Sequence, residues 1–325
     1  MQPDYTVFFI VQAGRLEYEA LIFVASFREA NPDFKGRLIA AEPTGAKWST
    51  PVAISDPVRR FLRDHGVEIL PFENRHFGES YPHGNKIEAM AALPAGPFVF
   101  FDTDTLFLGP LSQVGFDFDR PSASMRREGT WPEPQLYGAD YTTIWKSLYD
   151  KFGLDFDSSL DKSQYENYWQ RYLYFNAGWF FGADAQAFGK RFLHYAHAIR
   201  WDTPDALASQ SLDPWLDQVA LPLVIHSFGG GRPGPGLAGL DGDVTCHYRA
   251  LPLLYARESD AVVARLEAIC APQPVKRILR LHEPARKLIY QRKGLKLRAK
   301  IDRNALPRRE SMLRNAIKRE KLWLR

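Results

Sequence analysis

The stretch that decides the fold is Phe98-Val99-Phe100-Phe101-Asp102-Thr103-Asp104-Thr105-Leu106. Its four leading apolar residues are typical of a short strand that is buried on both faces inside a mostly parallel sheet. Two carboxylates follow this strand directly. Residues two apart in an extended segment point to the same side, so Asp102 and Asp104 can converge on one cation. The stretch therefore predicts a site for a hard divalent metal at the carboxyl edge of the sheet, where open α/β folds bind ligands.

The Asp-x-Asp spacing alone carries little information, because the chain holds three further copies, at 117–119, 155–157 and 241–243. None of these copies follows a buried-strand pattern, and Asp and Gly favour turns, so we expect turns or solvated loops there. The pair at Asp102 and Asp104 differs. Two close carboxylates beside a buried strand would repel each other and would cost free energy to desolvate, so a metal or a basic partner is expected.

Length and composition indicate a folded protein of enzyme size. A chain of 325 residues can form one large α/β domain or two smaller ones. The two cysteines, Cys246 and Cys270, suit neither a disulfide framework nor a metal-ligand spacing. The N-terminus lacks the features of a signal peptide, and no stretch approaches the roughly 18 to 20 apolar residues of a membrane span. We therefore expect a cytoplasmic protein.

The net charge of +4 conceals an asymmetry between two parts of the chain. Residues 273–325 carry 18 Lys and Arg against 4 Asp and Glu, a balance of +14, which leaves 24 against 34, or −10, for residues 1–272. This contrast predicts a main domain over 1–272 and a separate basic, helical C-terminal extension over 273–325.

Strands and helices alternate in the first hundred residues. Apolar runs predict strands over 6–11, 37–41 and 67–71, and helical spacing predicts helices over 15–30, 56–65 and 84–90. This alternation favours a mostly parallel sheet covered by helices. No Gly-x-Gly-x-x-Gly follows the first strand and no P-loop pattern occurs, which disfavours a dinucleotide fold or a P-loop enzyme.

Aromatic residues gather after the central strand. The segment from Trp131 to Trp179 holds 11 of the 22 Tyr and Trp residues, and we expect helices there over 140–152 and 163–172. Two interpretations stay open. The rings pack helices over one end of the sheet, or they line a cleft that faces carbohydrate, because aromatic rings pack well against the apolar faces of sugars.

Three later motifs carry polar groups near predicted element ends. Tyr174-Phe175-Asn176-Ala177-Gly178-Trp179-Phe180-Phe181 reads as a strand interrupted by Asn-Ala-Gly, and Gly inside a strand often marks a bulge or the close approach of a ligand to the backbone. A helix is expected over 212–221, with Asp217 and Gln218 on its first turns. A short strand is expected over 244–248, and His247 lies at its end.

Together, these motifs resemble the GT-A glycosyltransferases, in particular the retaining family 8 group that includes glycogenin and bacterial galactosyltransferases. The matching pieces are the loop after the first strand, the helix that bears Lys86, the Asp-Thr-Asp strand, Phe-Asn-Ala-Gly, Leu-Asp-Gln and a later strand-end histidine, all within residues 6 to about 250. The resemblance implies a mixed, mostly parallel Rossmann-like sheet flanked by helices. It also implies transfer of a hexose, with retention, from a UDP-linked sugar to a glycan, lipid-linked or surface-polysaccharide acceptor.

The resemblance further implies how the site is built. Mn²⁺ or Mg²⁺ would be held by Asp102, Asp104 and a histidine, and such an ion stabilises the charge that develops on a nucleoside diphosphate leaving group. Donor contacts would come from Gln12 and Gly14 near the base, and from Lys86, Asp102 and Thr103. Candidate catalytic groups would be Asn176 and Asp217 near the transferred sugar and Gln218 beside the anomeric centre.

The third metal ligand has three candidates, His226, His247 and His282. His247 is the choice here because it ends a strand-like segment. The family's Lys-Pro-Trp after the histidine is absent, so the resemblance assigns no diphosphate contact there.

Two other enzyme classes are alternatives. A phosphatase of the haloacid-dehalogenase type would use Asp102 as nucleophile in Asp-x-Asp-x-Thr, but Thr105 falls one place early and the strand is not the first of the chain. A nucleotidyltransferase would need a loop rich in glycine and basic residues after the first strand, and the segment 12–15 is too sparse for that.

The basic extension supports a non-catalytic alternative, a protein that binds membrane surfaces. Apolar residues alternate there with Lys and Arg, as in amphipathic helices on anionic membranes; they are Leu279, Leu281, Leu288, Ile289, Leu295, Leu297 and Ile301. The other interpretation is a set of solvated helices packed on the main domain. Nucleic acid is not expected as a partner. Membrane contact would fit an enzyme that sits at the inner face of the membrane and acts on a lipid-linked or surface-polysaccharide acceptor.

Overall fold

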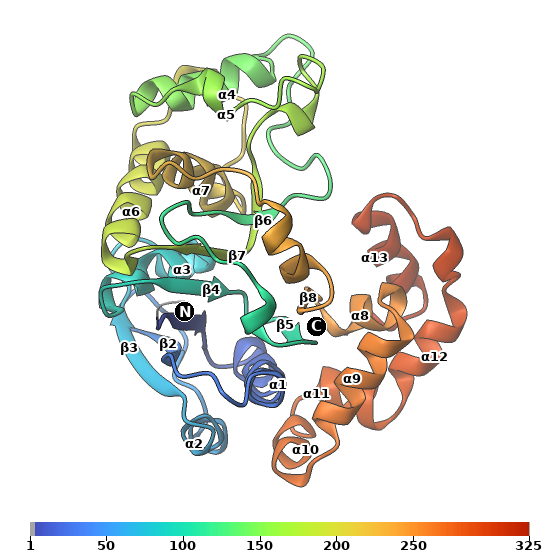
Figure 1. Cartoon of the computed structure of the whole chain (residues 1–325). Helices are drawn as coiled ribbons and strands as arrows, with labels where there is room; N and C mark the ends of the chain where they lie inside the picture. The colour runs from blue at the N-terminus through green and yellow to red at the C-terminus, as the bar shows by residue number, and fades with distance from the viewer. Residues whose placement is uncertain (1–3, 325) are drawn as a thin grey trace.

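A computed structural model describes residues 4–324 and shows a central six-stranded sheet (Figure 1). The strand order is β3-β2-β1-β4-β7-β6. Strands β1 to β4 are parallel, whereas β7 is antiparallel to β4 and β6 is antiparallel to β7. The strands are β1 (Thr6–Ile10), β2 (Leu38–Thr44), β3 (Glu68–Glu73), β4 (Phe98–Phe101), β6 (Ala123–Met125) and β7 (Phe175–Gly182). A separate two-stranded antiparallel ribbon pairs β5 (Thr105–Phe107) with β8 (Thr245–His247). The mixed, mostly parallel sheet confirms the expected fold class.

Strand β4 lies in the interior of the sheet, as its apolar sequence predicts, between β1 and β7. Its side chains alternate between two cores. Val99 and Phe101 belong to the core shared with α1 (Arg15–Ala30) and α2 (Asp56–Asp64). Phe98 and Phe100 belong to the core on the other face, which contains residues of α3 (Asn85–Glu88), α6 (Ala185–Trp201) and α7 (Leu216–Ser227). Helices therefore cover both faces of the sheet. Helix α7 begins at Leu216, four residues later than predicted.

The aromatic segment packs over the β7 side of the sheet with α4 (Tyr141–Lys151) and α5 (Phe156–Ser159). Trp131, Trp145 and Tyr174 are buried in that core, which supports the packing interpretation. Tyr137 and Tyr165 are exposed, so a carbohydrate-facing role stays a prediction for them.

The predicted helix over 163–172 is wrong. This segment forms turns that end in a single 3₁₀ turn (Trp169–Arg171). The carboxylate of Asp161 accepts hydrogen bonds from the backbone and the hydroxyl of Ser163, and Asn167 has a positive φ of 56°. Such local hydrogen bonds from Asp and Asn compete with helix formation.

The C-terminal part of the described chain is helical and lies along one side of the molecule (Figure 1). Its helices are α8 (Leu251–Arg257), α9 (Asp260–Cys270), α10 (Gln273–Leu279), α11 (Glu283–Ala285), a π-helical turn (Arg286–Tyr290), α12 (Lys293–Lys300) and α13 (Glu310–Arg319). Helix α10 contacts α1 and α9, while α12 and α13 contact α8. The predicted boundary at 272/273 falls between α9 and α10 and stays a prediction.

Most apolar side chains of the basic extension pack inside the protein. Leu279, Leu288, Ile289 and Leu297 are buried, and only Leu281 among those noted from the sequence is largely exposed. This packing favours helices docked on the main domain over an apolar face that is free for lipid. Across residues 4–324, no helix combines the length and the apolar character that crossing a membrane requires.

Candidate active site

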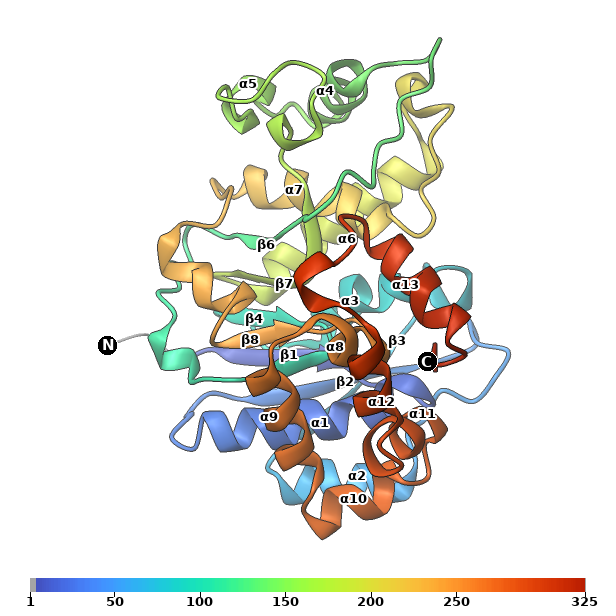
Figure 2. The same cartoon turned by 90° about the vertical axis from the view of Figure 1, so that its right-hand side faces the viewer.

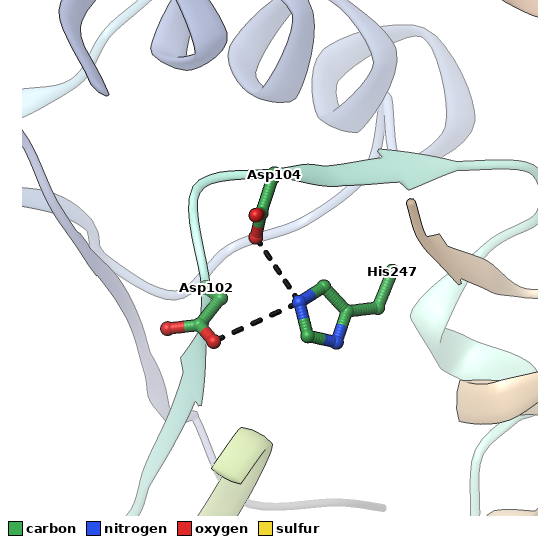
Figure 3. A group of neighbouring side chains, drawn as sticks. All are labelled: Asp102, Asp104 and His247. Carbon is green, nitrogen blue, oxygen red and sulfur yellow. Dashed lines mark ion pairs between the residues drawn. The ribbon is translucent and has the colours of Figure 1, made fainter. Parts of the chain in front are cut away.

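The two aspartates stand on either side of a bend in the chain (Figure 3). Strand β4 ends before Asp102, and β5 begins after Asp104. The carboxylates thus converge because the backbone turns between them, and not because of the alternation of an extended strand. Pairing of β5 with β8 sets Thr105 opposite His247. That pairing brings a residue from a distant part of the sequence beside both carboxylates.

These three residues form a compact group of candidate metal ligands. His247 Nε2 lies 3.1 Å from Asp104 Oδ1 and 3.7 Å from Asp102 Oδ2. One ligand atom from each residue lies within 4.8 Å of the other two. Carboxylate oxygens suit Mn²⁺ or Mg²⁺, and the imidazole nitrogen favours the transition metal Mn²⁺ over Mg²⁺. The other histidines lie elsewhere: His226 contacts the Ser158 hydroxyl at 2.9 Å, and His282 stacks on Tyr18.

Gly178 explains how the histidine fits. A Cβ atom added at Gly178 would lie 2.2 Å from His247 Nδ1, which is too close for any side chain. The Gly178 carbonyl also accepts a hydrogen bond of 2.8 Å from the backbone N–H of Asp102. Ala177 has a positive φ of 56°, and the pairing of β6 with β7 shifts register nearby. Of the two expectations, the bulge is present, and the group that approaches the Gly178 backbone is the imidazole of His247.

Lys86 places a buried positive charge beside this group. Its Nζ lies 3.0 Å from Asp102 Oδ1 and 3.3 Å from Asp217 Oδ2, and it donates to the Ala177 carbonyl at 3.3 Å. Burial alone would lower the pKa of Lys86, but the two carboxylates raise it above its usual value. For Asp102, burial raises the pKa of the carboxyl group, and the positive charge of Lys86 opposes this effect. Lys86 therefore links the candidate metal ligands to Asp217.

Asp217 is held in the first turn of α7 with only 1% of its surface exposed. The Tyr81 hydroxyl donates to Asp217 Oδ1 at 2.7 Å and accepts from the Asp217 backbone N–H at 2.9 Å. Hydrogen bonds to both the carboxylate and the backbone fix its position. The first turn of α7 thus places the Asp217 carboxylate beside Lys86, which also contacts Asp102.

Most of the predicted residues line one cavity of about 270 Å³. Asn176 and Gln218 line it beside Asp217; the Gln218 side chain accepts from the Tyr174 hydroxyl at 3.1 Å, and the Asn176 amide donates to the Met125 carbonyl at 3.2 Å. The lining residues are His83, Lys86, Asp102, Asp104, Arg126, Arg127, Glu128, Thr130, Asn176, Pro214, Trp215, Asp217, Gln218, His247, Arg249 and Arg314.

Three predicted donor residues lie outside this lining. Thr103 is buried, and its hydroxyl donates to the Ile10 carbonyl, which ties the end of β1 to the bend. The side chain of Gln12 accepts from Asn85 at 3.0 Å, next to Lys86 in the sequence. Gly14 begins α1 with a φ of 90°. Their role toward a nucleotide stays a prediction.

Several residues of the site were not predicted from the sequence, and four of them bear on its chemistry. Arg15 lies 3.5 Å from Asp104 Oδ2 and belongs to the segment 12–15, whose sequence is too sparse in glycine and basic residues to predict a triphosphate site. Tyr81, Arg126 and Arg314 were not singled out. The signal for Arg15 was its place after the first strand, at the sheet edge where ligands bind. The other three carry no local pattern, because only the tertiary fold brings Arg126 and Arg314 to the cavity and Tyr81 to Asp217.

The chain was compared with known families and structures. The family model described as the Rhodobacterales glycosyltransferase domain matches residues 7–229. This span contains the two aspartates of the bend, Asn176, Asp217 and Gln218, whereas His247 lies beyond it. A comparison with curated protein sequences found no match.

Solved glycosyltransferase structures show a distant similarity. The galactosyltransferase LgtC in complex with donor and acceptor sugar analogues is 14% identical, with a TM-score of 0.43 over 70% of this chain and 73% of that chain. GlyE of Streptococcus pneumoniae is 9% identical, with a TM-score of 0.38 over 71% and 46%. Mouse xyloside xylosyltransferase 1 in its apo form is 10% identical, with a TM-score of 0.38 over 71% and 85%.

The family match decides among the hypotheses drawn from the sequence. It confirms the resemblance to glycosyltransferases and decides against the phosphatase and the non-catalytic alternatives. Because the matched span covers well over half of the chain, the protein belongs to the Rhodobacterales glycosyltransferase domain family and is a glycosyltransferase.

Proposed function

We propose that the protein transfers a hexose, with retention and with the help of a divalent metal, from a UDP-linked sugar to a carbohydrate or lipid-linked acceptor. The observation that carries this proposal is the group of Asp102, Asp104 and His247 at the carboxyl end of β4, on the wall of a cavity that also holds Asp217. Retention and the UDP donor rest on the resemblance to family 8.

The donor set fits Mn²⁺ or Mg²⁺, which when bound would stabilise negative charge on a departing nucleoside diphosphate. Lys86 supports the same task, because its buried ammonium group lies at the candidate metal ligands and keeps its charge. Asp217 is fixed by Lys86 and Tyr81, so its carboxylate keeps one orientation toward the cavity. Asn176 and Gln218 present amide groups that suit hydroxyl groups of the transferred sugar.

The proposal also includes the location of the protein. The surface of the basic extension is rich in exposed Lys and Arg, which would draw it to an anionic membrane at the inner face of the cell. A lipid-linked acceptor would then lie within reach of the cavity.

A nucleotide-sugar screen tests the function. The full-length protein is incubated with UDP-, GDP- and CMP-linked sugars in Mn²⁺, Mg²⁺ or EDTA, and the released nucleotide is quantified by chromatography. We expect release from a UDP-hexose that requires metal and is lost in Asp102→Asn/Asp104→Asn. The matched control Asp117→Asn/Asp119→Asn alters an exposed Asp-x-Asp pair and should behave as wild type. Release that is unaffected by EDTA and by the first variant would contradict the proposal.

A further inference from the structure

Arg126 is a buried cation on the cavity wall that has no carboxylate partner. It follows β6 directly and has 7% of its surface exposed. Its guanidinium donates to the carbonyls of Trp131, at 2.9 Å, and Tyr172, at 3.5 Å. Its Cζ lies 4.7 Å and 4.8 Å from the ring centres of Trp169 and Tyr174. Within residues 4–324 its Nε finds no hydrogen-bond acceptor, and no carboxylate forms an ion pair with it.

This arrangement orients the guanidinium and leaves its charge uncompensated. Burial lowers the pKa of Arg126 to about 10, the direction expected when a cation is desolvated without an opposite charge. An unpaired charge at such a place is costly for folding, and aromatic faces and carbonyls offset only part of that cost. Because Arg126 lines the cavity, the partner that its charge calls for is an anionic group of a ligand.

The basic extension adds positive charge to the wall of the same cavity. Helix α13 lies beside α8 (Figure 2), and the carboxylate of Glu310, at its start, contacts the guanidinium groups of Arg249, Arg257 and Arg314. Arg249 and Arg314 both line the cavity. Arg257 is also paired with Glu258 at 2.9 Å, which leaves Arg249 and Arg314 to share the carboxylate of Glu310. One carboxylate does not neutralise these two guanidinium groups, so this part of the wall keeps a surplus of positive charge.

The two walls are joined. The backbone N–H of Glu310 donates to Glu128 Oε1 at 2.9 Å, and Glu128 is two residues from Arg126. The Glu128 carboxylate also lines the cavity, and within residues 4–324 it forms no ion pair with an arginine. Docking of α13 therefore assembles Arg314 and Arg126 around one space.

The place of Arg126 separates it from the candidate metal ligands. Strand β6, which ends just before Arg126, is separated by β7 from β4, which ends just before Asp102; neighbouring strands lie about 4.8 Å apart, so the backbone at Arg126 is roughly 10 Å from β4. A diphosphate held by a metal at Asp102 and Asp104 would occupy the other end of the cavity. An anion at Arg126 belongs to the second substrate.

We propose that Arg126, together with Arg314 of α13, binds an anionic group of the acceptor, a phosphate or a carboxylate, so that the enzyme selects acidic acceptors. This inference rests on the proposed function, because it assigns the donor to the metal end of the cavity. It gives α13 a part in the acceptor site, in addition to any contact with a membrane.

Calorimetry with simple probes tests the inference. Glucose 6-phosphate, methyl β-D-glucuronide and the neutral methyl β-D-glucoside are titrated into the full-length protein, with and without UDP and Mn²⁺. We expect at least one acidic probe to bind and the neutral probe to bind at least tenfold more weakly, because charge-assisted hydrogen bonds to arginine are strong. Binding of the phosphate alone or of the glucuronide alone identifies which anionic group is recognised.

Variants assign the binding to the arginines. Arg126→Gln should weaken binding of the acidic probe about tenfold or more, Arg126→Lys should retain part of it, and both should bind UDP as wild type does. Arg308→Gln is the matched control, since Arg308 is exposed and lies outside the cavity lining. Because Arg126→Gln removes a buried group, its folding is checked by circular dichroism, and Arg314→Gln at the half-buried rim gives the same test if it fails to fold.

The outcomes separate this inference from the proposed function. Equal binding of acidic and neutral probes, no binding of either acidic probe, or unchanged binding in Arg126→Gln and Arg314→Gln would overturn the acceptor site. Parallel loss of UDP affinity in the arginine variants would overturn it too, by assigning Arg126 to the donor. Failure of wild-type protein to bind UDP would instead count against the proposed function, while the titrations without UDP still report on Arg126.

Discussion

Because Gly178 has no side chain, it can contact two of the candidate metal ligands at once. Its carbonyl fixes the backbone of Asp102, and its bare Cα leaves the space that the His247 ring occupies. A Cβ atom at Gly178 would lie 2.2 Å from His247 Nδ1. In a closely packed site neither the Gly178 backbone nor the His247 ring can move away without cost. One residue thus positions a carboxylate and an imidazole that are distant in the sequence.

Gly178→Ala should therefore displace His247 and weaken metal-dependent UDP binding about tenfold or more, as expected when a ligand loses its supporting contacts. Gly234→Ala is the control, because a Cβ at Gly234 meets no atom within 4 Å. Calorimetry of UDP in Mn²⁺ measures both variants. If Gly178→Ala bound UDP as tightly as wild type, the imidazole would not be a ligand.

Tyr81 offers a second test at the residue scale. Tyr81→Phe removes the hydroxyl that bonds both the carboxylate and the backbone N–H of Asp217. We expect a loss of about 1–3 kcal/mol in the free energy of unfolding, because two buried polar groups lose their partner, and a fall in nucleotide release. Urea denaturation and the release assay measure the two effects.

Tyr248→Phe is the matched comparison for Tyr81→Phe. The Tyr248 hydroxyl is buried and, among the residues that the structure describes, has no hydrogen-bond partner. Its removal should leave the free energy of unfolding unchanged or raise it. Equal losses in the two variants would show that the Tyr81 hydroxyl does not hold Asp217.

Among the elements, α13 depends on the charge of one carboxylate. Burial would raise the pKa of Glu310, but the three surrounding arginines lower it to about 2. A carboxyl group whose pKa is lowered by folding stabilises the folded state above its ordinary value near 4.5, and this stabilisation disappears as the pH falls toward 2. Docking of α13 is therefore sensitive to acid.

Glu310→Gln should loosen α13 at neutral pH. We expect faster hydrogen exchange over residues 310–319 in this variant than in wild type, with no change in β4. The difference in the free energy of unfolding between the two proteins should have its full size above pH 4.5 and should decrease as the pH falls toward 2. A difference that is independent of pH would mean that the Glu310 charge does not hold the helix.

Sequence patterns predicted the elements whose order depends on local residues. The apolar run of β4 and the helical spacing of α1 each hold the information for their own element, and both are found as expected. The segment 163–172 was predicted wrongly, because Asp161 and Asn167 stabilise turns that periodicity does not register. Asp102 and Asp104 were found through their place after a strand, whereas the bend that brings them together belongs to the tertiary fold.

At the scale of the whole molecule, the cavity is lined by residues that lie far apart in the sequence, from His83 to Arg314. Lys86 comes from α3, Asp217 from α7, His247 from β8 and Arg314 from α13. Residues that face a ligand across such distances leave no periodic signal, which is why Arg126 and Arg314 could not be predicted. The charge asymmetry of the sequence did indicate that residues 273–325 are distinct, but it did not reveal that they reach the cavity.

The folded extension changes how membrane contact is tested. Deleting residues 273–325 would remove buried side chains such as Leu279 and expose the part of α1 that α10 contacts, so charge reversal on the surface is the cleaner experiment. Arg277→Glu/Arg280→Glu/Arg286→Glu alters exposed residues and should reduce binding to phosphatidylserine vesicles, at about 1 kcal/mol per basic residue. Co-sedimentation measures it.

The control for the vesicle experiment places the same charge change on other elements. Arg120→Glu/Lys162→Glu/Lys190→Glu alters three exposed residues outside the extension and should bind vesicles better than the extension variant. Equal binding of the two variants, or no vesicle binding by wild type, would remove the membrane contact from the proposal.

The central claim is that the bend after β4 is a metal-dependent donor site. Calorimetric titration of UDP into the full-length protein, with and without Mn²⁺, tests it most directly, together with Asp102→Ala/Asp104→Ala. The account predicts that UDP binds tightly only with Mn²⁺ and that the double variant loses this binding. Binding of UDP that is independent of both Mn²⁺ and the two aspartates would contradict it.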